Sequence, residues 1–482
     1  MKKYLSMALA VLLLLSLTAC GGSGSSGGSD DSSDDSEGNA TLQVGFARED
    51  ITPLSPVWIA GGGDASRISE NVLDYLYVTC VAVTDKAGNT QLFITQDLIN
   101  STVSMSEPAR QAISEKTGVP VDNIIIGATH THSAPGYYTP SRQGIPEYVN
   151  LYDSAIVRVC EKAMADRAPA TMSTGSVDAE GYVFVRRYYL DDGSVQGATG
   201  NKSASTTITD HLYDANDTMQ MVRFIRADKK DVLMTNIGVH ATFNGSTHLR
   251  NISADFPAGL RSYVEGRETD LLVAYFISAA GDQVADSDLP EKTHNLDYIA
   301  YGEKLGEFIC NALPFLQPVN DGVLKISNET LTAKTNLADP SKQAEAAALW
   351  ARMNNGGEGF AVCEAAAKAA GFAGIYECMA ITDRAKQKET RTCTVYTVTL
   401  GEMSFVAMPY EMTGASSADL VSRSPYGENT FIITCANGSN GYIPHEFLFD
   451  AGTYESYNSY YEKGTAEALV DLALKQLTAH KG

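Results

Sequence analysis

Two histidines follow a short, strongly apolar run near residue 125. The segment 123–136 reads Asn-Ile-Ile-Ile-Gly-Ala-Thr-His-Thr-His-Ser-Ala-Pro-Gly, so this run leads into His130 and His132 and then into a Pro-Gly turn. Residues 124–126 predict a buried strand, because β-branched runs bounded by turn residues are typical of strands. Side chains two residues apart in an extended chain point to the same face. The two imidazoles could therefore share a metal ion or acid–base chemistry; the alternative is a pair of polar residues that only closes the strand.

Three later segments repeat this arrangement of a strand followed by a residue that can bind a metal. His240 follows Met-Thr-Asn-Ile-Gly-Val, Glu411 follows Ser-Phe-Val-Ala-Met-Pro-Tyr, and Tyr442 follows a buried run and a Gly/Asn loop. Open α/β sheets bind ligands beyond the carboxyl ends of their strands. Two neutral imidazoles and a carboxylate form a ligand set that suits zinc. Each residue alone could be an ordinary loop residue, and their common placement is what favours a zinc site at the strand ends.

The elements that must position these residues alternate between strands and helices. This alternation predicts an α/β or α+β fold with a mixed β-sheet core flanked by helices. The Ala- and Glu-rich stretch 340–390 predicts helices that form an excursion from the main sheet. The expected strands are 42–46, 75–83, 91–95, 124–126, 219–225, 232–237, 271–277, 404–408 and 430–434, and the expected helices are 106–117 (capped by Ser104 or Ser106), 146–167 and 464–478.

The start of the chain is typical of a bacterial lipoprotein. Met1-Lys-Lys precedes a short apolar run, and Leu17-Thr-Ala-Cys20 matches the lipobox. We expect residues 1–19 to be a signal peptide, because the apolar run is short for a transmembrane helix; an uncleaved anchor is the alternative. Lipid on Cys20 would tether the exported protein to the outer face of a membrane. Residues 20–40, rich in Gly, Ser and Asp, predict a flexible linker before a globular domain over 41–482.

Charge and cysteine content limit the function further. The net charge of −22 argues against nucleic acid and against electrostatic docking on anionic lipid, and it suits a neutral or amphiphilic substrate. Seven of the eight cysteines remain if Cys20 is lipidated, so at least one thiol must stay free. The chain contains no Cys-x-x-Cys motif, and we assign no cysteine metal site.

Several segments together resemble the amidase domain of the neutral/alkaline ceramidase family, whose members are zinc enzymes that cleave the amide bond of ceramide. The likeness extends over about 41–450. It rests on Asp50-Ile-Thr-Pro53, on Thr129–Gly136 with Ala134 in place of a glycine, on Val185-Arg-Arg-Tyr-Tyr-Leu-Asp-Asp-Gly193, on His240 followed by Ile252-Ser-Ala-Asp-Phe-Pro257, on Gly281-Asp282, and on Glu411 and Tyr442.

The resemblance implies a ligand set and a division of roles. It implies that zinc is bound by His130, His240, Glu411 and Tyr442. His132 would lie beside the metal and contact the substrate. Arg186 would be the partner of a substrate oxygen, with Arg187 as the less favoured choice and otherwise a surface charge. Asp282 and Asp255 would orient groups around the site, although Asp255 fits a structural turn residue better.

Three departures from the family put ceramide itself in question. Val284 stands where ceramidases have an active-site serine, the chain ends at Gly482 before any C-terminal immunoglobulin-like domain, and the stretches 243–250 and 340–390 differ. The leading interpretation is a zinc-dependent hydrolase that cleaves the amide bond of ceramide or another N-acyl lipid by metal-activated water. The alternatives are a hydrolase of another N-acyl amide or ester, and a non-catalytic metal-containing surface lipoprotein that binds such a compound. Val284 favours the binding protein, whereas the retained metal-binding residues count against it.

Overall fold

A computed structural model describes residues 41–61, 67–137, 139–196, 207–247, 249–290, 292–354 and 357–482, without the side chains of residues 246 and 247. The expected signal peptide, Cys20 and the linker lie outside these residues. From residue 41 onward the chain forms one compact unit.

The largest element is a nine-stranded mixed sheet. Its order is β14 (Leu271–Ile277), β12 (Asp231–Ile237), β11 (Thr218–Arg226), β6 (Ala168–Asp178), β1 (Gln43–Asp50), β3 (Tyr77–Thr84), β4 (Thr90–Gln96) and β5 (Ile124–Ala128), and β16 (Gln317–Val319) also pairs with β6. The pairs β4–β5 and β12–β14 are parallel, and the other pairs in this sheet are antiparallel. The edges of this order approach each other, since Thr95 Oγ1 donates a hydrogen bond of 2.6 Å to the carbonyl of Tyr275. The ends of β5 and β12 can therefore contribute to one site.

Strand β5 shows why this sheet has such apolar strands. Ile124 and Ile126 pack into a core on one face, whereas Ile125 packs into a second core on the other face. A strand that is buried on both faces reads as a continuous apolar run and not as an alternating one. The predicted strand at 124–126 is confirmed.

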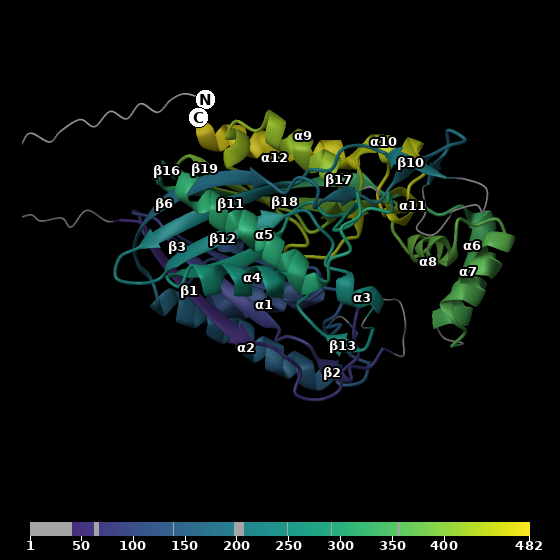
Figure 1. Cartoon of the computed structure of the whole chain (residues 1–482), viewed down its shortest axis with the longest axis horizontal. Helices are drawn as coiled ribbons and strands as arrows, with labels where there is room; N and C mark the ends of the chain where they lie inside the picture. The colour runs from purple at the N-terminus through teal and green to yellow at the C-terminus, as the bar shows by residue number, and fades with distance from the viewer. Residues whose placement is uncertain are drawn as a thin grey trace, which may run out of the picture. The chain divides into compact units, whose positions relative to one another are not determined.

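Helices cover the outer face of the large sheet. Helices α1 (Val103–Thr117) and α2 (Ile145–Ala165) pack on β1, β3, β4 and β5, while α4 (Phe256–Arg267) and α5 (Tyr298–Ala312) pack on β11, β12 and β14. Figure 1 shows α1 and α2 on one side of the sheets and α9 and α12 on the other. Helix α1 begins at Val103 after Thr102, and neither predicted cap, Ser104 nor Ser106, occupies the cap position.

A smaller sheet packs against the inner face of the large one. Its order is β17 (Leu324–Lys334), β18 (Thr390–Leu400), β19 (Met403–Ala407) and β21 (Thr430–Ile433). Phe405 and Phe431 of this sheet share one core with Phe93 and Phe276 of the large sheet. Helices α9 (Gly414–Arg423) and α12 (Thr465–Lys481) cover its other side. The fold is thus two sheets between two layers of helices, and the predicted mixed sheet core flanked by helices is confirmed.

Short elements complete the fold. They are β2 (Asn71–Val72), β7 (Phe184–Val185), β8 (Tyr188–Leu190), β9 (Val195–Gln196), β10 (Ile208–His211), β13 (Asn251–Ile252), β15 (Gln283–Val284), β20 (Glu411–Met412), β22 (Tyr442–Ile443), α3 (Phe243–Thr247), α10 (Glu446–Asp450) and α11 (Tyr454–Asn458).

The helical excursion predicted for 340–390 is present. It contains α6 (Pro340–Asn354), α7 (Phe360–Ala369) and α8 (Ile375–Arg384), which pack around their own small core. In Figure 1 α6 and α7 stand out at one end of the compact unit. This insertion is the part of the fold that departs most from the central sheets.

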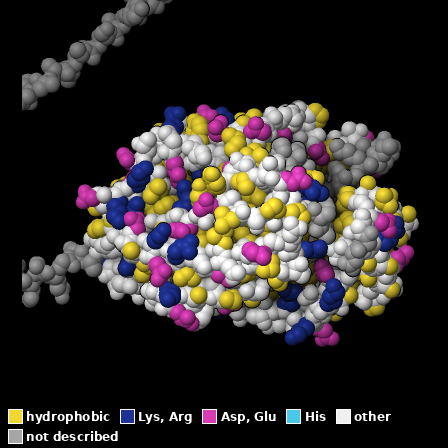
Figure 2. All heavy atoms as spheres, turned by 90° about the horizontal axis from the view of Figure 1, so that it is seen from below, with side chains coloured by type: hydrophobic (Ala, Val, Ile, Leu, Met, Phe, Trp, Pro, Cys, Tyr) yellow, Lys and Arg dark blue, Asp and Glu magenta, His cyan; other side chains and the backbone are white. Residues whose placement is uncertain are grey.

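The surface of the protein carries charged side chains of both signs. On the face in Figure 2 acidic and basic side chains lie interspersed, with hydrophobic side chains between them. In the part of the chain that the structure describes, no helix is long and apolar enough to cross a membrane.

The seven cysteines of the described residues are all buried and free, so the predicted free thiol is confirmed.

Candidate metal centre

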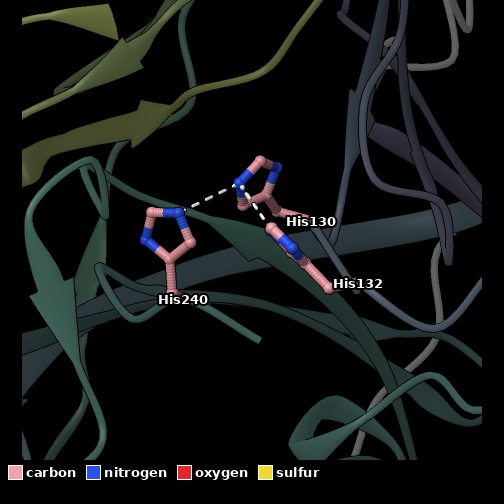
Figure 3. A group of neighbouring side chains, drawn as sticks. All are labelled: His130, His132 and His240. Carbon is pink, nitrogen blue, oxygen red and sulfur yellow. Dashed lines mark hydrogen bonds between the residues drawn. The ribbon is translucent and has the colours of Figure 1, made fainter. Parts of the chain in front are cut away.

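Three histidines from different strand ends converge in the interior. His130 follows β5, His132 lies two residues further on, and His240 follows β12 (Figure 3). The Nε2 atoms of His130 and His240 are 3.3 Å apart, and those of His130 and His132 are 3.4 Å apart. The ligand atoms of all three lie within 4.8 Å of one another. The structure therefore brings together the predicted pair and the predicted third histidine.

Each imidazole is oriented by a backbone carbonyl. The Nδ1 atom of His130 contacts the carbonyl of Ile99 at 2.5 Å, that of His240 contacts Ala280 at 2.6 Å, and that of His132 contacts Gly61 at 3.0 Å. A carbonyl oxygen only accepts hydrogen bonds, so each Nδ1 carries the proton and donates it. In the neutral form of each ring, the Nε2 atom then presents a lone pair to a common point. Converging lone pairs repel one another unless a proton or a metal ion lies between them. Accordingly, although burial opposes it, Cys435 and Glu411 raise the pKa of His130 well above its usual value.

His130 adopts a backbone conformation that suits this role. Its φ angle is 64°, in the left-handed region that residues other than glycine rarely adopt. Such a conformation costs free energy and persists where the surrounding structure enforces it, often at a functional site. The turn takes the chain from the end of β5 toward the carbonyl of Ile99 and places the ring against His240.

Glu411 supplies a carboxylate to the same point. Its Oε2 atom is 3.4 Å from the Nε2 atoms of both His130 and His240. This oxygen is buried and has no hydrogen-bond partner among the described residues. Although burial raises the pKa of this carboxyl, the neighbouring His130 and His240 hold it well below its usual value. Glu411 is therefore ionised and available as a ligand.

These distances match the ligand spacing of a tetrahedral zinc ion. With zinc–ligand bonds of about 2.1 Å, two ligand atoms of a tetrahedral site lie about 3.4 Å apart. His130, His240 and Glu411 show this spacing along all three of their edges, 3.3, 3.4 and 3.4 Å. Burial and Arg186 lower the pKa of His240 to about 4, and burial together with His130 lowers that of His132 well below its usual value. The residues present fit a cation of this kind.

Tyr442 lies beside Glu411, as the predicted ligand set requires. Strands β20 and β22 pair in parallel with Glu411 opposite Tyr442, and partners in such a register project from the same face. The Nη2 atom of Arg186 donates to the Tyr442 hydroxyl at 3.3 Å. It also donates to the carbonyl of Gly281 at 2.7 Å, and Nε donates to Glu455 at 3.1 Å. Arg186 is thus held immediately behind the phenol of Tyr442.

Glu455 is one residue at this site that the sequence did not reveal. It is fully buried between Arg186 and Arg187, accepting from Arg187 Nε at 2.8 Å and pairing with Arg187 Nη2 as well. Arg187 is 1% exposed, so its interpretation as a surface charge is wrong. Burying a guanidinium is tolerable because this carboxylate neutralises it. The acidic residue stands in an ordinary-looking Tyr-Glu-Ser-Tyr-Asn segment, which carried no signal.

The two aspartates differ in their surroundings. Asp282 accepts a 3.0 Å bond from the Gly414 N–H and a 2.5 Å bond from the Tyr213 hydroxyl, and its own carbonyl accepts from the Arg186 N–H. Its carboxylate thus faces the start of α9, and its link to the site runs through the backbone of Arg186. Asp255 caps the start of α4 and also accepts from the Asn244 N–H, as the structural interpretation predicts.

Val284 lies in a short strand that supports the site from outside. It is half-buried in β15 and pairs with Phe184 of β7. Its neighbour Gln283 donates to the carbonyl of Gly238, and the Gln283 carbonyl accepts from the His240 N–H. A further unpredicted neighbour is Cys435, whose Sγ is 3.7 Å from His130 Nδ1.

A cavity of about 540 Å³ opens over the centre. One part of its wall is His132, Glu411 and Tyr442, and another is contributed by α6 and α8 of the insertion. Apolar and aromatic residues from the insertion include Trp350, Tyr376 and Met379. The excursion predicted at 340–390 therefore forms a wall of the cavity. Deep, partly aromatic cavities with a few polar groups at one end are typical of sites for small molecules.

Comparisons with known proteins agree with this architecture. The neutral ceramidase from Pseudomonas aeruginosa superimposes with a TM-score of 0.70 at 16% sequence identity, over 92% of this chain and 75% of that chain. A ceramidase complexed with C2 superimposes with a TM-score of 0.69 at the same identity and coverage. No protein-family model matches the chain, and no curated protein matches it in sequence. At this identity the likeness establishes a shared fold, and the predicted ceramidase-like fold is confirmed.

Proposed function

We propose that this protein is a zinc-dependent hydrolase of the neutral ceramidase family that cleaves the amide bond of ceramide or a related N-acyl lipid. One observation carries the proposal: the Nε2 atoms of His130 and His240 and the unpartnered Oε2 of Glu411 form a triangle with edges of 3.3–3.4 Å. The triangle lies beside a cavity large enough for a small amphiphile. The shared fold with two ceramidases supports the choice of reaction.

The roles of the residues follow from their positions. His130, His240, Glu411 and Tyr442 would hold the zinc ion. When bound, zinc would polarise the substrate carbonyl and lower the pKa of water to about 7 in favourable sites. The carbonyls of Ile99 and Ala280 accept from Nδ1 of the ligand imidazoles and so fix their orientation, with Nε2 toward the centre.

Three further residues would act on the substrate or around it. His132 lines the cavity with its Nε2 atom toward the centre, where it could contact the substrate. Arg186 would stabilise negative charge that develops on a substrate oxygen. Its contact with the Tyr442 hydroxyl gives it a second way to act, through that phenol. Asp282 would act as a positioning residue, because its carbonyl holds the Arg186 N–H at 2.9 Å.

The side chains of the cavity wall would keep water away from the acyl chain of a bound substrate. The aromatic residues of the insertion offer an apolar surface for an acyl chain in the same cavity that His132, Glu411 and Tyr442 line. This arrangement suits an amphiphilic N-acyl compound. We also propose that the protein is exported and anchored through lipidated Cys20 to the outer face of a bacterial membrane, where such substrates lie. Membrane association that persists in a Cys20→Ser variant would contradict the anchor.

The test of the reaction is a substrate panel. Purified protein is assayed with fluorogenic ceramides of several chain lengths and with short N-acyl amides and esters, and fatty acid release is measured. We expect turnover of at least one amide, lost in a His130→Ala variant and retained in His445→Ala, a histidine that pairs with Glu467 outside the cluster. Binding of these compounds without any release would support a binding protein instead. Turnover of soluble amides alone would favour the other N-acyl hydrolase, and a Val284→Ser variant would then show whether a hydroxyl there restores ceramide turnover.

A further inference from the structure

Two parts of the chain contribute much of the lining of the cavity over the centre. The insertion contributes the apolar and aromatic side chains of Trp350, Tyr376 and Met379, together with the acidic Asp383. The segments around the Thr-His-Thr-His motif form another part of the wall. There His132 contacts the carbonyl of Gly61, and the Trp58 ring packs against Gly136, where a Cβ atom would approach the indole to 2.1 Å. Trp58 and His132 therefore belong to one rigid surface.

Arg142 adds a positive charge to this surface. It lines the cavity, and its Cζ atom lies 5.4 Å from the centre of the Trp58 ring. Among the described residues Arg142 has no carboxylate partner, and the cavity-lining Asp383 pairs with Lys386 instead. A guanidinium that stacks on an indole keeps its edge and its five N–H donors free for a ligand. The chain has a net charge of −22, and the Arg142 guanidinium stands out in it as a positive charge inside a cavity without a carboxylate partner among the described residues.

A second donor lies in the same turn. The Arg142 N–H donates to the carbonyl of Thr139 at 3.0 Å, so the two residues form one short turn at the cavity wall. The Thr139 hydroxyl is buried and has no hydrogen-bond partner among the described residues. A buried hydroxyl without a partner costs free energy. A ligand oxygen that reaches this turn would give the hydroxyl the acceptor that it lacks.

We propose that Arg142 and Thr139 form a subsite for a carboxylate on the substrate, so that the preferred substrate is an N-acyl amino acid. This inference rests on the proposed function and names the substrate class of the same site. The acyl chain would lie along the aromatic insertion wall, and the carboxylate of the amine part would lie against Arg142. Hydrolysis would consume one water, break the amide C–N bond, and release a fatty acid and an amino acid.

A carboxylate fits this subsite better than a phosphate. A single guanidinium matches the two oxygens of a carboxylate with two parallel hydrogen bonds. A phosphate dianion would bring more negative charge into a cavity that also contains Asp383 and Glu411. Among the described residues that line it, Arg142 is the only lysine or arginine.

Ligand binding in this cavity can be followed by tryptophan fluorescence. The chain has two tryptophans, Trp58 and Trp350, and both line this cavity, so intrinsic fluorescence reports its occupancy. The probes are N-(dodecylsulfonyl)glycine and N-(dodecylsulfonyl)ethanolamine, which share a chain, resist amide hydrolysis and differ in the carboxylate. The corresponding phosphate ester of the second probe is the third arm. We expect the glycine compound to bind at least tenfold more tightly than the neutral one.

Variants then assign the preference to the subsite. We expect Arg142→Gln to abolish the tenfold preference while it leaves the affinity for the neutral probe within about twofold, and Arg142→Lys to retain part of it. Thr139→Val should reduce the preference by a smaller factor. The matched control is Arg352→Gln on α6, which removes the same charge from a surface pair with Glu358 and should change nothing.

The outcomes separate this inference from the proposed function. Equal affinities for the charged and neutral probes, or a preference that survives in Arg142→Gln, would overturn the carboxylate subsite even if ceramides are hydrolysed. A stronger preference for the phosphate arm would overturn the choice of carboxylate. Intact Arg142-dependent binding without hydrolysis of N-lauroylglycine or of any ceramide would contradict the proposed reaction and leave the subsite standing. Hydrolysis of ceramides but not of N-lauroylglycine would overturn the N-acyl amino acid as the preferred substrate.

Discussion

His130 and His240 place their Nε2 atoms 3.3 Å apart, although they follow β5 and β12, which lie six positions apart in the order of the large sheet. The approach of the sheet edges makes this possible, since β4 contacts β14 through Thr95 and Tyr275. Both rings donate from Nδ1 to carbonyls, and therefore both offer lone pairs at the short contact. The short contact therefore needs a cation between the two atoms, either a proton or a metal ion.

Replacing Glu411 with Gln should weaken metal binding strongly. The variant keeps the shape of the side chain but removes the charge that lies 3.4 Å from both imidazoles. We expect the affinity for zinc to fall at least tenfold to a hundredfold, measured by competition with a chromogenic chelator. Asp383→Asn, a cavity residue on α8, is the control and should bind zinc like the wild type. Unchanged affinity in Glu411→Gln would remove the carboxylate from the ligand set.

Glu455→Gln should destabilise the fold. Glu455 is the buried partner of both Arg186 and Arg187, and its loss leaves a guanidinium buried without a counter-charge. Breaking a buried pair from one side costs about 3–5 kcal/mol in the free energy of unfolding. Asp471→Asn breaks an exposed pair with Arg423 and should cost less than about 1 kcal/mol. Urea unfolding of the two variants compares these values, and similar losses for both would contradict the assignment.

Asp282 should make stability depend on pH. Burial, with a further contribution from Glu455, raises its pKa from 3.8 to about 6. Between these values the folded state keeps a proton that the unfolded state has lost, so the stability contributed by this group falls as the pH rises from 4 to 6. Asp282→Asn cannot ionise, and it should gain on the wild type by at most about 1.4 kcal/mol per pH unit in that window. Urea midpoints of both metal-free proteins at pH 4.5 and 6.5 measure this; a difference that does not change with pH would contradict the raised pKa.

Trp350→Ala should weaken substrate binding without removing the centre. Trp350 belongs to the insertion wall, and its truncation removes apolar surface from the cavity. Each buried CH₂-sized group contributes about 0.8 kcal/mol, so we expect KM for a long-chain substrate to rise roughly tenfold while kcat changes little. Zinc content should equal that of the wild type. A loss of kcat with unchanged KM would instead place this side chain nearer the reacting bond.

The sequence predicted the central parts of this molecule and missed those with weak local patterns. Strand β5 was visible because burial on both faces demands a continuous apolar run. Strand β6 was missed, since Pro169 and Gly175 and several small polar residues interrupt its pattern while pairing with β1, β11 and β16 maintains it. Strands β17 and β18 were also missed; β17 is largely half-exposed and polar.

The candidate site shows the same limit. His130, His240 and Glu411 were predicted because each follows an apolar strand, and the structure brings all three together. Glu455 and Cys435 come from loops and a short helix that meet the site only in three dimensions. The role of the insertion as a cavity wall depends on the path of its helices, which composition alone does not specify.

The most direct test of the account is the metal content of the purified protein. Elemental analysis of protein expressed with sufficient zinc should find close to one zinc per chain, and a His130→Ala His240→Ala double variant that still folds should lose it. Wild-type protein that arrives without zinc under these conditions, or a double variant that retains a full equivalent, would contradict the metal centre and with it the proposed hydrolase.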